Sequence, residues 1–257
     1  MRVGEEANKI VSKVRADELV VMFGLAPTRS RAQALILAGK VYVGNVRVDK
    51  AGAQLAEDAP LAIRGSDHPY VSRGGVKLAG ALDAFGVDPR GKRCIDLGAS
   101  TGGFTDCLLQ RGAASVAAVD VGYGQLAHKL RVDPRVHVLE RTNARTLEAS
   151  QVGGMADLVV VDASFIGLGK LIGAIVRCLL PGGELVALVK PQFEVGRAEA
   201  SKTRGVVRDP ALRARAIDGA VADVAASGLE ILGTTDCILE GPRGNLEAFV
   251  HARKKTC

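Results

Sequence analysis

The chain has 257 residues, which is enough for a single large fold or for a large domain with a small companion. It contains no tryptophan, few other aromatic residues and 31 glycines, a composition that suits an α/β domain around a buried parallel sheet. The net charge of +6 fits a polyanionic partner, although charge alone supports a neutral ligand about equally.

The sequence disfavours a secreted, membrane-spanning or metal-binding protein. The charged N-terminus lacks the apolar core of a signal peptide, and no apolar run approaches the roughly 20 residues that cross a bilayer. The five cysteines form no CxxC pair and no Cys/His pair at metal-ligand spacing. We therefore expect reduced, buried thiols, no metal and a cytoplasmic location.

Residues 15–64 predict a small compact unit, and the polar segment 1–14 before it is expected to be frayed or to form a short helical extension. Thr28 or Ser30 can cap the second helix of the unit, and the Gly44-Asn45 pair predicts a hairpin turn. The expected elements are, in chain order, helices over 16–23 and 29–38 and strands over 40–43, 46–48 and 59–63.

A turn-rich stretch at 65–71 is expected to link a first domain, 1–64, to a second domain, 72–257. In the second domain apolar strands alternate with helices, which indicates a parallel sheet covered on both faces. Strands are expected over 93–97, 116–121, 136–139, 158–161 and 184–189, and helices over 104–111, 124–129 and 168–179. A long helix opened by Pro210 precedes two last strands, expected to pair antiparallel at the sheet edge, over 229–238 and 246–252.

The first strand of the second domain ends in a glycine-rich turn, DLGASTGGF over 96–104. Glycines let the backbone approach a ligand closely, because a Cβ would collide with it. The spacing DxGxxxGG differs from the GxGxxG of dinucleotide binders and from the GK[ST] of phosphate loops. Asp120 ends the next strand, where a carboxylate can accept hydrogen bonds from both ribose hydroxyls of an adenosine ligand, or can simply serve a turn. Together with the Pro-Gly-Gly run at 181–183, typical of methyltransferases before the fifth strand, these features favour S-adenosylmethionine as the cofactor.

Charged residues follow two further strands of the predicted sheet. Asp162 follows strand 158–161 and Lys190 follows strand 184–189, so both side chains should reach the crevice at the carboxyl ends of the strands. Lys190 could instead be an exposed lysine whose stem lies along the surface. Lys77, in a helix before the first strand, and Glu247, at the start of the last strand, complete a set of two amines and two carboxylates.

These motifs resemble the TlyA family of ribosomal RNA cytidine 2′-O-methyltransferases, often described as haemolysin A. The matching runs cover nearly the whole chain: VSRGGVKL, DLGASTGGFTD, ERTNAR, VVVDASF, VKPQFE and GVVRDP, with SRAQALILAGKVYVG resembling the core of an S4 RNA-binding domain. The resemblance implies an α/β, Rossmann-like class I methyltransferase fold with a mostly parallel seven-stranded sheet, plus a small N-terminal α+β S4-like domain. It also implies ribosomal RNA or a ribosomal subunit as partner, and we expect a monomer.

The second domain is also similar to FtsJ-type ribose methylases, whose catalytic Lys-Asp-Lys-Glu set falls on Lys77, Asp162, Lys190 and Glu247. A ribose hydroxyl is a poor nucleophile until a base draws its proton away. Free lysine has a pKa near ~10.4, so it can act as a base only where burial or a nearby cation favours the neutral amine. We expect Lys190 to be the base, Lys77 beside it to polarise the hydroxyl, and the two carboxylates to orient the amines.

Two larger sets of contacts follow from the motifs and the resemblance. Cofactor contacts are expected at Asp96, Gly98, Ser100, Thr101, Gly102, Gly103, Phe104, Asp120, Asn143 and Asp162. Basic residues expected to hold RNA phosphates, or else to form a solvated surface, are Arg29, Arg31, Lys40, Arg47, Arg73, Arg204 and Arg208.

Other functions fit only parts of the sequence. The lack of a signal peptide and of a membrane-spanning run disfavours a secreted or contact haemolysin. The complete Lys-Asp-Lys-Glu set disfavours an RNA-binding protein with an inactive methyltransferase domain. Asp162-Ala163-Ser164-Phe165 stands where a base N-methylase would carry an asparagine-proline-proline-aromatic motif. One departure from the family is Tyr70 in the linker, where a tryptophan is common.

Overall fold

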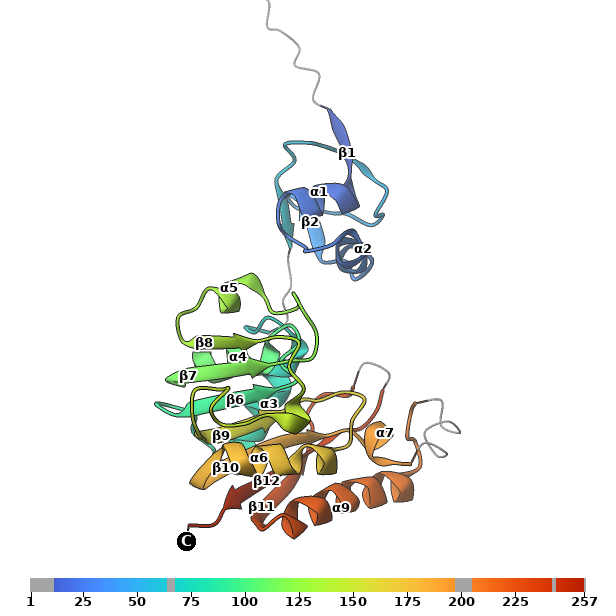
Figure 1. Ribbon diagram of the computed structural model, residues 1–257. Helices are drawn as coiled ribbons and strands as arrows, with labels where there is room; N and C mark the ends of the chain where they lie inside the picture. Colours follow the sequence, from blue (N-terminus) through green and yellow to red (C-terminus); the bar gives the residue numbers. More distant parts are fainter. Residues whose placement is uncertain (1–11, 64–67, 197–204, 242–243, 257) are drawn as a thin grey trace, which may run out of the picture. The chain divides into compact units, whose positions relative to one another are not determined.

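The computed structural model describes residues 12–63, 68–196, 205–241 and 244–256. The chain forms two compact units, Met1–Pro69 and Tyr70–Cys257 (Figure 1). The expected linker, 65–71, spans the boundary between them, and part of it lies outside the described residues. None of the helices in the described ranges combines the length and the apolar character that a bilayer span requires.

The N-terminal unit packs two helices against short antiparallel strands. Its elements are β1 (Lys13–Arg15), α1 (Ala16–Met22), α2 (Arg29–Leu37), β2 (Val41–Val43), β3 (Val46–Arg47), β4 (Gln54–Ala56) and β5 (Leu61–Ile63). The predicted hairpin is present as β2–β3, β5 pairs with the other edge of β2, and the Thr28 side chain caps α2 by accepting a hydrogen bond from the Arg31 amide. Apolar side chains of both helices form its core with Val41 and Val48.

One expectation for this unit is wrong. Residues 13 and 14 do not extend as a helix: they belong to β1, which pairs antiparallel with β4, a strand that the sequence pattern did not predict. Both strands have only three residues and carry polar side chains, so no hydrophobic alternation marks them. Their backbone pairing, over residues far apart in the sequence, holds them in place. The remainder of the expected extension, residues 1–11, lies outside the described part.

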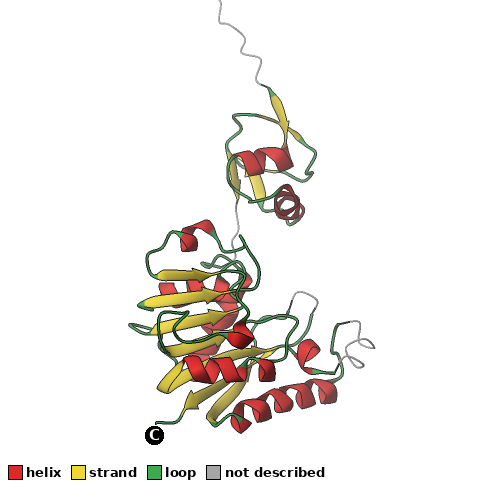
Figure 2. Ribbon diagram, viewed as in Figure 1, coloured by secondary structure: helices red, strands yellow, loops and turns green. Residues whose placement is uncertain are grey.

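The larger unit is a seven-stranded sheet with helices on both faces (Figure 2). Its strands are β6 (Arg93–Leu97), β7 (Ser115–Val119), β8 (Val136–Leu139), β9 (Ala156–Val161), β10 (Leu179–Val189), β11 (Leu229–Asp236) and β12 (Ala248–Lys254). They lie in the order β11-β12-β10-β9-β6-β7-β8. Strand β12 is antiparallel to both of its neighbours, β11 and β10, and the five strands from β10 to β8 in this order are parallel to one another. The expected fold class and antiparallel edge pair are therefore confirmed.

Side-chain alternation along the buried strands builds a separate core on each face of the sheet. In β9, Val159 and Val161 face one core, whereas Leu158 and Val160 face the other. The first core is covered by η2 (Leu168–Lys170), α6 (Ile172–Cys178) and α9 (Pro210–Ala226). The second is covered by α3 (Arg73–Phe85), α4 (Gly103–Gln110) and α5 (His128–Arg131). Burial on both faces explains the continuous apolar runs in the sequence.

Two local expectations differ from the structure, and one short helix was not expected. The helix expected over 124–129 begins only at His128, after a turn in which Gly124 has a positive φ of 69°. The Pro-Gly-Gly run does not precede the fifth strand but lies inside β10, which starts at Leu179 and crosses a register shift before Glu184. A short helix, α7 (Pro191–Glu194), was not predicted; it is a single turn with proline at its first position.

Candidate active site

The carboxyl ends of the parallel strands bring Asp162 and Lys190 together. Asp162 directly follows β9 and Lys190 directly follows β10, and these strands are neighbours in the sheet. The Lys190 Nζ lies 2.6 Å from Asp162 Oδ1, an ion pair, and donates a hydrogen bond to Ser164 Oγ at 2.9 Å. The amine is therefore held by one carboxylate and one hydroxyl at the strand ends.

Lys77 and Glu247 form a second ion pair, which is more deeply buried. Lys77 lies in the second turn of α3, and Glu247 immediately precedes β12. Gly241 packs onto the carboxylate, since a Cβ there would lie 2.8 Å from Glu247 Oε1. The structure thus places each of the two lysines against its own carboxylate, as the expected orienting role requires.

Residues that the sequence did not single out hold the segment that carries Glu247. Arg213 of α9 donates from Nε to the Leu246 carbonyl at 2.9 Å and from Nη2 to the Glu247 carbonyl at 3.5 Å. The buried side chain of Asn245 accepts from the Val207 amide and donates to the Gly205 carbonyl, both at 2.9 Å. A proline-opened helix and a buried amide carry no sequence signal for this function, because both also serve ordinary folds.

A cavity of about 170 Å³ lies beside the Lys190–Asp162 pair. The glycine-rich turn after β6 forms one wall, and the start of α3 forms another. Its lining residues are Ser72, Gly74, Gly98, Ala99, Ser100, Thr101, Gly103, Phe104, Asp162, Ser164 and Lys190. Gly98 has a φ of +87°, and a Cβ at this position would lie 2.7 Å from the backbone oxygen of Asp162. Only glycine fits there without displacing the end of β9.

Two carboxylates lie next to this turn in different environments. Asp96 is fully buried, and its Oδ2 accepts from the Thr105 amide at 2.9 Å and hydroxyl at 2.7 Å. Its Oδ1 has no hydrogen-bond partner among the described residues. Burial raises the pKa of Asp96 to about 7, although the Thr105 hydrogen bonds oppose the shift. Asp120 is half-buried and accepts from the amides of Ser100 at 2.8 Å and Gly122 at 2.6 Å.

These features fit S-adenosylmethionine. Asp120 keeps unused lone pairs for ribose hydroxyls, because each carboxylate oxygen can accept more than one hydrogen bond. The Asp96 carboxyl, two residues before the cavity-lining Gly98, has one oxygen without a partner among the described residues, and in its ionised form it would favour a cationic ligand nearby. Phe104 is buried and stacks on Phe249, with ring centroids 6.1 Å apart, so it acts through packing. Asn143 is exposed and its Oδ1 caps η1 (Ala144–Thr146) by accepting from Arg145 N, which leaves its amide nitrogen for a ligand.

Two aromatic side chains lie on segments next to cavity-lining residues: Phe165 follows Ser164, and Phe193 lies on α7, which follows Lys190. Phe165 is 91% exposed and has a φ of +66°, a conformation that bulky residues rarely adopt. Its ring lies 5.3 Å from the ring of Phe193, centroid to centroid, on α7. Strained, exposed side chains of this kind cluster at functional sites. Both residues belong to runs that the sequence analysis quoted, DASF and KPQFE, yet neither was proposed for the site.

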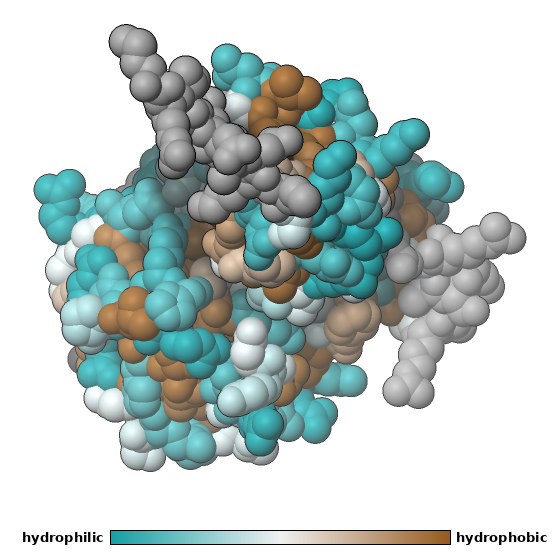
Figure 3. Space-filling view, turned by 90° about the horizontal axis from the view of Figure 1, so that it is seen from above, coloured by the Kyte–Doolittle hydropathy of each residue, from teal (hydrophilic) through white to brown (hydrophobic). Residues whose placement is uncertain are grey.

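The expected RNA-contacting residues fall into two groups. Arg29 pairs with Asp17 and Glu18, each at 3.0 Å, and Arg47 pairs with Asp49 at 2.6 Å. Hydrogen bonds from Arg15, Gln33 and Arg29 hold the pKa of the buried Asp17 far below its usual value, so Arg29 has a structural task. Arg31 and Arg208 are exposed, Lys40 is half-buried, and the exposed Arg73 donates to the Glu240 carbonyl at 3.3 Å; Arg204 lies outside the described residues. The face in Figure 3 is mainly hydrophilic, with small hydrophobic patches between.

The sheet, the glycine turn and the two lysine–carboxylate pairs define an S-adenosylmethionine-dependent methyltransferase. The FtsJ-like methyltransferase family matches residues 70–254, and the S4 domain family matches residues 14–59. The 16S/23S rRNA (cytidine-2′-O)-methyltransferase TlyA of Mycobacterium tuberculosis is 47% identical over 95% of this chain and 91% of its own length. The chain belongs to the TlyA family of FtsJ-like methyltransferases.

Two further relatives carry a haemolysin name. Hemolysin A of Brachyspira hyodysenteriae is 38% identical over 93% of this chain and 99% of that protein. The solved structure of a Streptococcus thermophilus protein with a hemolysin name covers 95% of this chain and 90% of its own, at 38% identity and a TM-score of 0.75. The haemolysin names thus occur on proteins similar to this methyltransferase along nearly their full length.

Proposed function

We propose that this protein transfers the methyl group of S-adenosylmethionine to the ribose 2′-hydroxyl of a cytidine in ribosomal RNA. The observation that carries the proposal is the Lys190–Asp162 ion pair at the wall of the cavity, which the glycine turn also lines. A hydroxyl nucleophile needs a proton acceptor within reach of the methyl donor. The name of the Mycobacterium tuberculosis relative, a 16S/23S rRNA (cytidine-2′-O)-methyltransferase, supports this acceptor. An acceptor of this kind would place the enzyme in the cytoplasm.

Lys190 is the proposed base. When bound, S-adenosylmethionine supplies an electrophilic methyl group on its sulfonium. The ion pair with Asp162 holds the amine in its charged form, so Lys190 must first release a proton to solvent. The neutral amine then takes the 2′-hydroxyl proton as the oxygen–methyl bond forms and the sulfur–methyl bond of the donor breaks, and Asp162, 2.6 Å away, stabilises the resulting ammonium. Ser164 holds the amine from the other side at 2.9 Å. Lys77, held by Glu247, does not line the cavity, so it is proposed to keep its proton and to polarise the hydroxyl through its charge.

The RNA is held by surfaces on both units. The S4 match over residues 14–59 supports an RNA-binding role for the N-terminal unit. Its exposed Arg31, with Arg73 and Arg208 of the larger unit, is proposed to contact phosphates, which position the RNA without reading its sequence. Phe165 and Phe193 offer aromatic faces on which an unstacked target base can lie beside the ribose that reacts.

Mass mapping of ribose methylation tests the acceptor. Ribosomal RNA from cells with and without the protein should differ by 2′-O-methylcytidine at one or more defined positions. RNA that shows no difference in ribose methylation would refute the activity and would favour an RNA-binding protein with an inactive methyltransferase domain.

Variants of Lys190 test the base. Lys190→Ala should slow single-turnover methyl transfer by about 10²–10⁴-fold, the usual contribution of a general base. Lys190→Arg should be nearly as slow, because a guanidinium stays protonated near neutral pH. Cofactor binding, measured by calorimetry, should remain close to that of the unaltered protein in both variants. A Lys190→Arg enzyme with near-normal rates would show that Lys190 supplies only charge.

A further inference from the structure

The loop between β9 and η2 carries two residues on the side of the site that is proposed to receive the RNA nucleotide. Ser164 accepts the hydrogen bond of the Lys190 amine at 2.9 Å, and Phe165 presents its ring to solvent. The left-handed backbone at Phe165 is unfavourable for a residue with a large side chain. A loop that keeps this conformation needs firm attachments on both sides of Phe165.

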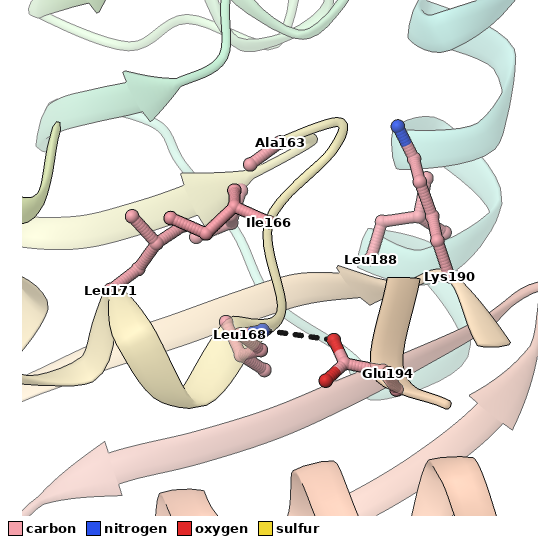
Figure 4. Close-up of a pocket in the computed structure, with 8 residues that line it drawn as sticks. Ala163, Ile166, Leu168, Leu171, Leu188, Lys190 and Glu194 are labelled. Carbon is pink, nitrogen blue, oxygen red and sulfur yellow. Dashed lines mark hydrogen bonds between the residues drawn. The ribbon is translucent and has the colours of Figure 1, made fainter. Parts of the chain in front are cut away.

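Both attachments come from the five-residue segment Lys190–Glu194. On one side of Phe165, Lys190 Nζ donates to Ser164 Oγ. On the other side, the Leu168 amide donates to Glu194 Oε1 at 2.8 Å, the bond drawn dashed in Figure 4. Gly167 lies against the same carboxylate, since a Cβ there would be 2.8 Å from Glu194 Oε2. The Phe165 and Phe193 rings touch between these two attachments.

Glu194 is not part of the reacting set, because its carboxylate points away from the Lys190 amine (Figure 4). Burial raises the pKa of Glu194, and the negative charge of Asp223 adds to the shift, so keeping a carboxylate here has an electrostatic cost. The space enclosed by the loop, the Lys190 stem and Glu194 is only about 10 Å³, room for one water at most. The loop is therefore already seated on the segment that ends in Glu194.

We propose that Glu194 is a positioning residue that locks the Ser164–Phe165 loop in the conformation that receives the RNA nucleotide. The inference rests on the proposed function for its RNA substrate, but the tether itself can be tested without RNA. Removing the Glu194 acceptor leaves the Leu168 amide without its bond and frees one end of the loop. The other end, at Ser164, stays attached to Lys190.

The absence of tryptophan from the chain makes a direct test simple. Phe165→Trp creates a protein with a single tryptophan, whose time-resolved anisotropy reports the local motion of the loop. Adding Glu194→Ala should increase this motion, whereas Glu194→Gln, which keeps a carbonyl oxygen of similar reach, should restore the original anisotropy. Glu230→Ala, on the exposed edge strand β11, is the matched control and should change nothing.

The same substitutions in the protein with Phe165 separate positioning from a general loss of structure. Glu194→Ala should lower the rate of methyl transfer to ribosomal RNA by about 10- to 100-fold, the effect of a displacement near 1 Å, and leave the affinity for S-adenosylmethionine unchanged. Glu194→Gln should recover most of the rate. Unchanged anisotropy in Glu194→Ala, an equal defect in Glu194→Gln, or a parallel loss of cofactor affinity would each overturn the inference. Failure of the unaltered protein to methylate RNA would refute the proposed function instead, while the anisotropy result would stand.

Discussion

Replacing Gly98 with alanine adds one methyl group where the glycine turn meets the end of β9. The new Cβ would lie 2.7 Å from the carbonyl oxygen of Asp162, 2.9 Å from its carbonyl carbon and 3.0 Å from Ala163 Cα. All three neighbours are backbone atoms, so no side-chain rotation can relieve the contacts. To restore an ordinary separation of about 3.5 Å, the turn and residues 162–163 must move apart by roughly 1 Å. A displacement of that size can cost about 100-fold in a positioned interaction.

A second glycine separates this displacement from simple backbone strain. Gly91 also has a positive φ, +69° against +87° at Gly98, but no described atom lies within 4 Å of its Cβ position. Alanine at either site incurs the left-handed penalty of about 1–2 kcal/mol. Gly91→Ala and Gly98→Ala should therefore both lower the free energy of unfolding. Only Gly98→Ala should also lose cofactor affinity.

Calorimetric titration with S-adenosylmethionine and urea unfolding of the two variants provide the comparison. We expect Gly98→Ala to bind the cofactor about 100-fold more weakly, following the displacement argued above, and Gly91→Ala to bind it normally. If Gly98→Ala bound the cofactor as tightly as Gly91→Ala does, the turn would not hold the cofactor at Gly98. The placement of the whole cofactor site would then be wrong.

Three further outcomes are expected. Because burial raises the pKa of Asp96 to about 7, a cationic cofactor should displace a proton from this carboxyl as it binds, so the affinity for S-adenosylmethionine should increase as the pH rises through 7. Calorimetry in buffers of different ionisation enthalpy would detect the released proton, and Asp96→Asn should abolish the release. Phe165→Ala should slow methyl transfer to RNA by about 10- to 100-fold, from a stacking loss of ~1–3 kcal/mol, while Phe165→Tyr stays active and cofactor affinity is unchanged in both. Arg31→Ala should reduce the slope of log affinity for RNA against log salt by about 1, whereas Arg29→Ala should mainly lower the free energy of unfolding, since Arg29 pairs with the buried Asp17; an unchanged slope in Arg31→Ala would place the RNA contacts elsewhere.

The long buried elements could be predicted from the sequence, and the short ones could not. The bounds predicted for β6 and β8 match the structure. β6 is buried from Cys94 to Leu97, and β8, the partly exposed edge strand, has apolar residues at three of its four positions. The start of α9 was equally clear from Pro210. Strands β1 and β4 depend on pairing with each other across about forty residues, so their own sequences contain little of the information that forms them.

The residues of the site also divide into those that could be placed from the sequence and those that could not. The position of a charged residue directly after an apolar strand places Asp162 and Lys190 at one edge of the sheet. The sequence did not reveal which lysine contacts which carboxylate: Lys77 and Glu247, 170 residues apart, meet only because β12 returns beside β10. The hydrogen bond that Glu194 accepts from the Leu168 amide could not be predicted either, since a glutamate in a one-turn helix is ordinary in any exposed segment.

The two ion pairs differ in burial, and the difference suits them to different tasks. The side chains of Lys77 and Glu247 are 9% and 1% exposed, and neither lines the cavity beside the glycine turn. Breaking such a buried pair costs about 3–5 kcal/mol, so both charges are kept and the pair acts as a fixed dipole. Lys190 and Asp162 are 11% and 26% exposed, and both line that cavity. A base must pass its proton to solvent after every turnover. Of the two lysines, Lys190 lines the cavity and has a partly exposed partner, which favours it as the proposed base.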